Sequence, residues 1–278
     1  MKKIFVVLNG ANTENTILFA CYIAGFTKSR LTGIFPAELP YAKEPALKHV
    51  LGQVYVESIV ENDVSFSESY INEIAQQQAL FENICKNKGI PYRVFKDPHV
   101  NADELIAESR LADLIIIDTA PDTRYQKEEE RNKLTRLLLS DAECPVLIAP
   151  AVFEPVDEVI FCYDGSASAV FAMKQLTYLL PGLEDVRVTA LQVGDEDELE
   201  AVENSRLRDW LKGNYRYTDI VTITGTPDKE LFNFLLKKKR TLVVLGAYGR
   251  NMISRFFHQS KADLIIDSLP FPIFITHY

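Results

Sequence analysis

The chain has 278 residues, of which 47% are hydrophobic, and a formal net charge of −9 at pH 7. This composition can bury a sizeable core in one or two domains and excludes a disordered chain, while the acidic balance excludes a general nucleic-acid surface, which requires clustered Lys and Arg. No apolar run approaches the roughly 18 residues of a membrane span, and the residues after Met1 show no signal-peptide cleavage site, so we expect a cytoplasmic protein with neither a nucleic-acid nor a membrane partner.

Five short apolar segments in the first half predict buried strands. They cover residues 4–8, 31–35, 92–95, 113–117 and 144–148. Helical patterns separate them, and parallel strands need such long connections, so we expect right-handed crossovers. Residues 36–64 are an insertion relative to the second half, and their prolines predict a long loop.

The second half repeats this order. Strands are predicted at residues 159–163, 186–193, 219–224, 242–246 and 272–276, and helices after residue 166, at 196–211, after Thr226-Pro227 and at 260–269. The fold class is therefore α/β, with two tandem doubly wound five-stranded parallel-sheet domains. We expect the domains to cover residues 1–152 and 153–278, with the boundary in the proline-bearing stretch 150–155.

The two halves are expected to associate within the chain. Such repeats often pack about a pseudo-two-fold axis, as the subunits of a homodimer would. The apolar segments 147–152 and 274–278 would supply this contact and form a pseudo-dimer. A further homodimer of whole chains remains open.

Cysteine and histidine spacing indicates no metal site. Cys21, Cys85, Cys144 and Cys162 form no C-x-x-C pair, and the four histidines lack a spacing such as H-E-x-x-H. We expect neither zinc nor disulfides. No serine lies in a nucleophile-elbow setting, so no catalytic residue is assigned. The basic run 237–240 is interpreted as cations at the negative end of a helix.

A candidate nucleotide site follows from the strand at 242–246. This strand ends at Gly246, with Gly249 shortly after it and Ser260 at the start of a helical pattern. Glycine lets backbone approach a ligand, and a helix start offers N–H groups to phosphate. If the first and fourth strands of this half are neighbours, Asp164 and Gly246 converge where the winding direction reverses. The alternative is that the glycines shape a tight turn and that Ser260 caps a helix.

These residues resemble the universal stress protein family, over essentially the whole chain. The resemblance implies an adenine-nucleotide α-hydrolase-like fold, often found as tandem pairs. In nucleotide-binding members an Asp ends the first strand, and a G-x2-G-x9-G-[S/T] loop follows the fourth. Asp164, Gly246, Gly249 and Ser260 match, while Gln259 stands at the third Gly. The resemblance therefore implies ATP, with Mg²⁺, as the cofactor of the second domain, and Gln259→Gly is expected to tighten binding if this side chain obstructs the phosphates.

The first half departs from the motif at every matched position. Asn9 replaces the Asp, and Asp118 and Pro121 stand at the first two glycines. Arg131 stands opposite Gln259, and Asn132 stands opposite Ser260. A carboxylate near the phosphates is repulsive, and proline lacks an N–H group. We therefore expect a degenerate site in the first domain and a partly retained motif in the second.

Three functional classes follow. The first is a cytoplasmic universal stress protein that binds ATP or a related adenine nucleotide in a regulatory role, with weak ATP hydrolysis at most. The second is a nucleotide-independent module for dimerisation or protein interaction, which Gln259 favours. The third is an enzyme such as an ATP pyrophosphatase, but neither residues 9–12 nor residues 164–167 reproduce its phosphate loop.

Overall fold

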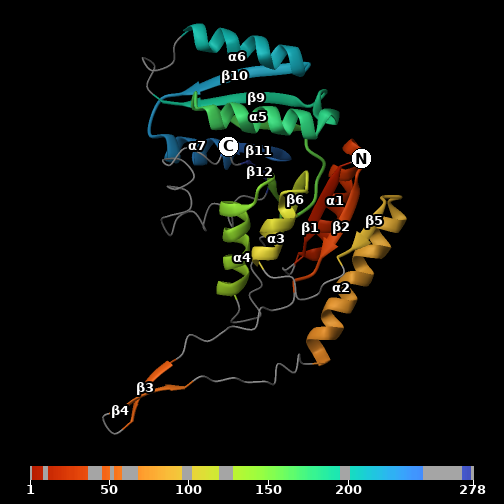
Figure 1. Ribbon diagram of the computed structural model, residues 1–278. Coiled ribbons are helices and arrows are strands. Elements are labelled where there is room, and N and C mark those ends of the chain that lie inside the picture. The colour runs from red at the N-terminus through yellow and green to blue at the C-terminus, as the bar shows by residue number, and fades with distance from the viewer. Residues whose placement is uncertain are drawn as a thin grey trace.

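The computed structural model describes residues 2–8, 12–36, 46–50, 53–57, 68–95, 102–118, 128–194, 201–246 and 271–276. Strands and helices alternate along most of this length (Figure 1). The strands are β1 (Lys3–Val7), β2 (Arg30–Ile34), β3 (Ala46–Val50), β4 (Gln53–Glu57), β5 (Tyr92–Val94), β6 (Leu114–Ile117), β7 (Val146–Ile148), β8 (Glu158–Cys162), β9 (Arg187–Val193), β10 (Tyr217–Ile223), β11 (Thr241–Gly246) and β12 (Ile273–Thr276). The helices are α1 (Thr13–Thr27), α2 (Glu68–Asn87), α3 (Ala102–Ser109), α4 (Glu128–Asp141), α5 (Ala167–Leu179), α6 (Ala201–Asn214) and α7 (Pro227–Leu235).

Ten strands form one sheet in the order β10-β9-β8-β11-β12-β7-β6-β1-β2-β5. Neighbours are parallel except at the centre, where β12 and β7 are antiparallel. The predicted α/β fold is confirmed, but the two expected five-stranded sheets are continuous. Their seam pairs Leu147 with Phe274, both within the segments expected to meet, and Ile148 with Ile273, which lies one residue before the second segment.

Helices cover both faces of the sheet, as a doubly wound fold requires. Alternate residues of each strand point to opposite faces, so Phe161 and Ile160 of β8 belong to different cores. The first core contains buried residues of α1, α2, α5 and α6, and the second contains those of α3, α4 and α7. The helices of the first face come from both halves, which makes that core continuous across the seam.

Local sequence explains the starts of two helices in the second half. Ser166 caps α5, because its Oγ accepts a hydrogen bond from the Ala169 N–H at 3.1 Å. Gly225 has φ +136°, and Pro227 then takes the first position of α7, where the missing N–H costs nothing. The helix expected at 196–211 is found as α6, which ends at Asn214; residues 195–200 lie outside the described part of the chain.

The insertion contains a hairpin that the expected long loop did not include. Strands β3 and β4 pair antiparallel, with His49 opposite Val54, and Figure 1 shows them standing away from the ten-stranded sheet. The sequence signal was Val54-Tyr55-Val56, a run of strand-forming residues preceded by Gly52. Residues 37–45, 51–52 and 58–67 lie outside the described part of the chain.

The connection between the halves lies along α1. It contributes Phe153, whose ring packs against those of Phe19 and Tyr22. Hydrogen bonds add to this packing: Asn12 Nδ2 donates to the carbonyls of Pro150 (3.2 Å) and Ala151 (2.7 Å), Asn15 Oδ1 accepts from Phe153 N–H (3.2 Å), and Tyr22 Oη accepts from Val156 N–H (3.1 Å). The predicted boundary segment is therefore held against the first half.

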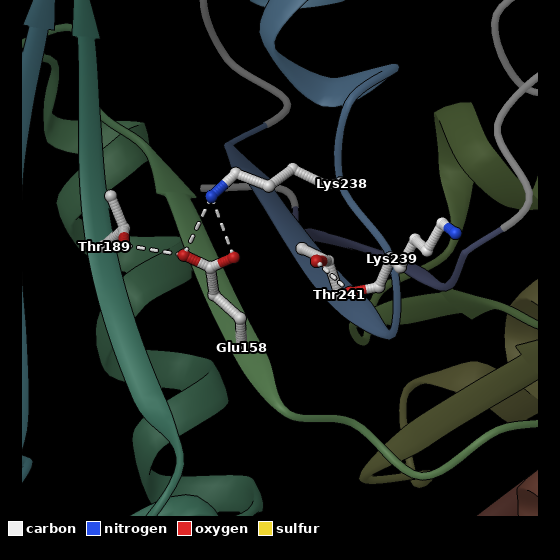
Figure 2. A network of polar contacts seen from close by, with 5 residues as sticks. All are labelled: Glu158, Thr189, Lys238, Lys239 and Thr241. Carbon is white, nitrogen blue, oxygen red and sulfur yellow. Dashed lines mark hydrogen bonds and ion pairs between the residues drawn. The ribbon is translucent and has the colours of Figure 1, made fainter.

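The basic run after α7 does more than complement a helix end. Lys238 Nζ donates to both carboxylate oxygens of Glu158, at 3.1 and 2.9 Å, and Thr189 Oγ1 donates to the same carboxylate at 2.9 Å (Figure 2). The Lys238 ammonium also lies 4.6 Å from the centre of the Phe234 ring. In the first half Lys3, likewise the first residue of the central strand, pairs with Glu108 at 3.2 Å. The first residue of the central strand is thus the cation of the ion pair in the first half (Lys3) and the anion in the second half (Glu158).

Candidate functional site

The site predicted from the sequence lies where the winding of the second half reverses. Strand β8 has β9 on one side and β11 on the other, and Val159 pairs with Leu242 of β11. Asp164 follows the end of β8, and Gly246 ends β11. The two strands are neighbours, which is the condition under which the sequence placed Asp164 and Gly246 together, and both residues lie at the same carboxyl edge of the sheet. Ligands of doubly wound sheets bind at such positions.

Asp164 belongs to a turn that starts α5. Its Oδ1 accepts a hydrogen bond from the Ser166 N–H at 3.0 Å, and Gly165 adopts φ +77° between them. A left-handed conformation of this kind is accessible to glycine without strain. The Asp164 side chain is exposed at the edge of the sheet, so its carboxylate can accept hydrogen bonds from hydroxyl or amino groups of a ligand.

Gly246 meets the first turn of α5. A Cβ placed on Gly246 would overlap the Ser168 backbone and would lie 2.6 Å from Ser168 Oγ. The close packing of helix against strand therefore requires glycine here, whether or not a ligand binds. The sequence attributed the need for glycine to a nucleotide or a tight turn. Ser168 is 78 positions away, and neither segment's pattern indicates that the two residues are in contact.

Thr276 is a further candidate residue at this edge, which sequence reasoning missed. It ends β12 directly beside Gly246, and its side chain is 1% exposed. Its neighbour Phe274 belongs to the core on the α5 face, so the alternation of the strand places Thr276 on that face too. Within the part of the chain that the structure describes, the Thr276 hydroxyl has no hydrogen-bond partner. A buried polar group without a partner is costly, and a ligand at this edge could satisfy it.

The remaining predicted site residues are not placed. Gly249, Gln259 and Ser260, with the helix expected at residues 260–269, lie outside the described residues. The structure therefore brings together Asp164, Gly246 and the start of α5, and it leaves the second part of the motif a prediction.

A buried thiol lies two residues before Asp164, in the core on the sheet face opposite α5. Cys162 ends β8 and is 5% exposed. Burial, and next the negative charge of Asp164, raise its pKa to about 12. It therefore stays protonated at neutral pH and is a poor nucleophile.

At the matching edge of the first half, the side chain of Asp118 occupies the start of α1. Asp118 follows β6 and is 3% exposed, and its Oδ2 accepts a hydrogen bond from the Asn12 N–H at 3.2 Å. Asn12 is the N-cap of α1, so a carboxylate lies at the positive end of this helix. An anionic ligand would meet a negative charge there. Asn9 and Pro121 lie outside the described residues, and so do Arg131 and Asn132 with respect to their side chains.

Two absences can be stated for the residues that the structure describes. Among them, no group of three or more His, Cys, Asp or Glu side chains gathers as metal ligands would. In the same residues, no helix combines the length and apolar character needed to cross a bilayer.

Solved structures share this fold. A universal stress protein from Archaeoglobus fulgidus superposes with a TM-score of 0.66 at 16% sequence identity, and the match covers 99% of this chain and 96% of that chain. A protein of unknown function from Pseudomonas aeruginosa superposes with a TM-score of 0.56 at 17% identity, covering 100% of this chain and 92% of the other. Neither a protein-family model nor a curated protein matches this chain. The fold is thus the one seen in a universal stress protein.

Proposed function

We propose that this chain is a cytoplasmic universal stress protein whose second domain binds ATP or a related adenine nucleotide in a regulatory role. The carrying observation is the placement of Asp164 and Gly246 at the ends of neighbouring strands where the winding reverses. Two domains, 1–152 and 153–278, would form a pseudo-dimer, and the antiparallel pairing of β7 with β12 supports this division. Binding, with weak hydrolysis at most, would be the function.

In this proposal each described site residue has a definite role. Asp164 accepts hydrogen bonds from the base or the ribose, because its carboxylate is exposed beside the start of α5. The Thr276 hydroxyl contributes a buried donor and acceptor next to Gly246. Gly249, Gln259 and Ser260 would contact the phosphates, with Mg²⁺ supplied by the nucleotide complex. The partnerless Thr276 hydroxyl is the observation that fits a polar ligand at this edge.

Isothermal titration of the nucleotide-stripped protein with Mg-ATP tests the proposal. We expect saturable binding that Asp164→Ala weakens at least tenfold. A matched control is Asp219→Ala, because Asp219 is also exposed and its Oδ1 also accepts a local backbone hydrogen bond, but it lies on β10. Absence of heat at millimolar ATP from the folded protein, or equal weakening by both variants, would contradict the proposal.

Substitution of Gly246 is a poor test of binding. Any side chain there would collide with Ser168, so loss of binding by Gly246→Asp would not separate a damaged site from a damaged fold. Thr276→Val is better suited, since it replaces the hydroxyl by a group of similar shape. We expect Thr276→Val to weaken nucleotide binding while leaving the folded protein intact.

A second candidate is a nucleotide-independent module for dimerisation or protein interaction. The observation that favours it is the contact of Gly246 with Ser168, which explains the glycine by packing alone. Asp118, which occupies the helix start of the other half, shows that this fold tolerates a closed edge. Titration distinguishes the candidates, because a folded protein without nucleotide affinity supports the second.

A further inference from the structure

Two cysteines that are far apart in sequence face each other across the contact between α1 and α2. Cys21 Sγ and Cys85 Sγ lie 3.9 Å apart, and the residues are 5% and 0% exposed. A disulfide needs a sulfur–sulfur distance of about 2.05 Å, so side-chain rotation and a small helix movement must bring the atoms together. Nothing in the spacing of the two residues along the chain signalled this pair.

The environment of this pair differs from that of the other two cysteines. The hydrogen bond between the two thiols lowers the pKa of Cys21, burial opposes this change, and the nearby positive charge of Lys88 lowers the pKa further. The pKa of Cys85 is raised, because it holds the shared proton and is buried. Burial raises the pKa of Cys144 to about 12. Cys21 is therefore favoured as the thiolate, which is the form that reacts with oxidants.

The pair lies at the end of the sheet, away from the seam. Helix α2 packs on α1 and against β5, the strand at one edge of the sheet. Glu82, Asn83 and Lys86, which flank Cys85 in α2, are exposed, so the sulfurs lie beneath a single helix. Local opening of α2 would admit a small oxidant without disturbing the seam or the candidate nucleotide site.

We propose that Cys21 and Cys85 form a redox modification site, at which hydrogen peroxide or a related hydroperoxide produces a reversible disulfide between α1 and α2. The site is independent of nucleotide binding. It rests on the facing sulfur atoms, and it joins two helices on either side of the insertion that carries the β3–β4 hairpin.

The chemistry proceeds in two balanced steps. The Cys21 thiolate attacks one peroxide oxygen, the O–O bond breaks, and hydroxide leaves and takes a proton to form water, so that Cys21 becomes a sulfenic acid. Cys85 then attacks the Cys21 sulfur, the S–O bond breaks, and a second water leaves. The two thiols lose two electrons and two protons in total, and the peroxide accepts them as it is reduced to two waters. A dithiol reductant reverses the reaction by thiol–disulfide exchange.

The test is oxidation of the full-length, folded protein with hydrogen peroxide, followed by alkylation under denaturing conditions and non-reducing peptide mapping. We expect a peptide pair linked through Cys21 and Cys85, lighter by two hydrogens and separated by dithiothreitol. Cys144 and Cys162 serve as internal controls and should be alkylated in full. Full alkylation of Cys21 and Cys85 after oxidation, or equal oxidation of all four cysteines, would overturn the proposal.

Variants then assign the two roles. In Cys85→Ser the sulfenic acid on Cys21 cannot be resolved, so a dimedone reagent should label Cys21. In Cys21→Ser, Cys85 should remain largely unlabelled. Stronger labelling of Cys85 than of Cys21 would overturn this assignment of roles. If either variant fails to fold, the peptide map of the oxidised, unsubstituted protein still tests the proposal.

Discussion

Gly246 and Ser168 pack so closely that a Cβ on Gly246 would lie 2.6 Å from Ser168 Oγ and would overlap the Ser168 backbone. The strand whose last residue begins the predicted motif is therefore in direct contact with the first turn of α5. The absence of a side chain at Gly246 therefore allows the first turn of α5 to lie directly against the carboxyl edge of the sheet.

Gly246→Ala should destabilise the protein by about 1–3 kcal/mol, the usual cost of overpacking. The obstacle is backbone, which cannot rotate away. The control is Gly213→Ala, because Gly213 lies in α6 with nothing within 4 Å of an added Cβ. That substitution should stabilise by about 0.4–1 kcal/mol through the unfolded state. Urea unfolding measures both, and equal effects would refute the steric explanation.

Lys238→Met should lower the free energy of unfolding by about 1–2 kcal/mol. This loss lies between the losses typical of breaking an exposed and a buried salt bridge. The side chains of Lys238 and Glu158 are 25% and 14% exposed, so the substitution leaves a mostly buried carboxylate without its cation. The reference is Arg216→Met, which breaks the pair with Asp185 whose side chains are 65% and 60% exposed. We expect a loss below about 1 kcal/mol there. Chemical denaturation at two salt concentrations compares them, and a larger effect at Arg216 would speak against this ranking.

Tyr22→Phe should cost about 1–2 kcal/mol, because it leaves the N–H of buried Val156 without its acceptor. The aromatic packing with Phe153 is retained, so the loss reports the hydrogen bond. Tyr217→Phe is the matched control, since Tyr217 is 57% exposed, and it should change stability by less than about 0.5 kcal/mol. Thermal unfolding followed by circular dichroism checks the pair. A neutral Tyr22→Phe would mean that the connection between the halves is held by other contacts.

Stability should fall between pH 10 and pH 12 in a manner that depends on Tyr215. Burial raises the pKa of Tyr215 from 10.0 to about 12. The folded state therefore retains the proton where the unfolded state loses it, so this contribution is complete below pH 10 and disappears as the pH rises through the folded pKa. Its size is roughly 2 kcal/mol. The slope of unfolding free energy against pH should become shallower in Tyr215→Phe, and an unchanged slope would assign the effect to other groups.

Much of the fold could be predicted because it is specified locally. Strand β8 and its turn at Asp164-Gly165-Ser166 follow from an apolar run and from turn chemistry, and the Thr226-Pro227 helix start follows from the fixed φ of proline. The parallel pairing within each half follows from the long helical connections between consecutive strands. The two halves have a similar order of strands, helices and turn residues, and this similarity predicted which segments would occupy matching positions.

What could not be predicted depends on contacts between distant residues. Three such contacts join elements that are each recognisable from their own sequence, so neither sequence indicates the contact. They are the Gly246–Ser168 contact, the Cys21–Cys85 pair and the Lys238–Glu158 ion pair. The hairpin at β3 and β4 was missed because prolines dominate the interpretation of the insertion. Thr276 was missed because one polar residue at a strand end has no sequence signature.

Because β7 and β12 are antiparallel, the strands of the two halves run in opposite directions along the sheet. Strands of one half end where strands of the other begin, so the carboxyl ends beside Asp164 and those beside Asp118 open in opposite directions. One small ligand cannot touch both. A larger partner that docks along either edge would contact strand ends of one half and strand starts of the other, and could distinguish the two sides of a molecule built from similar halves.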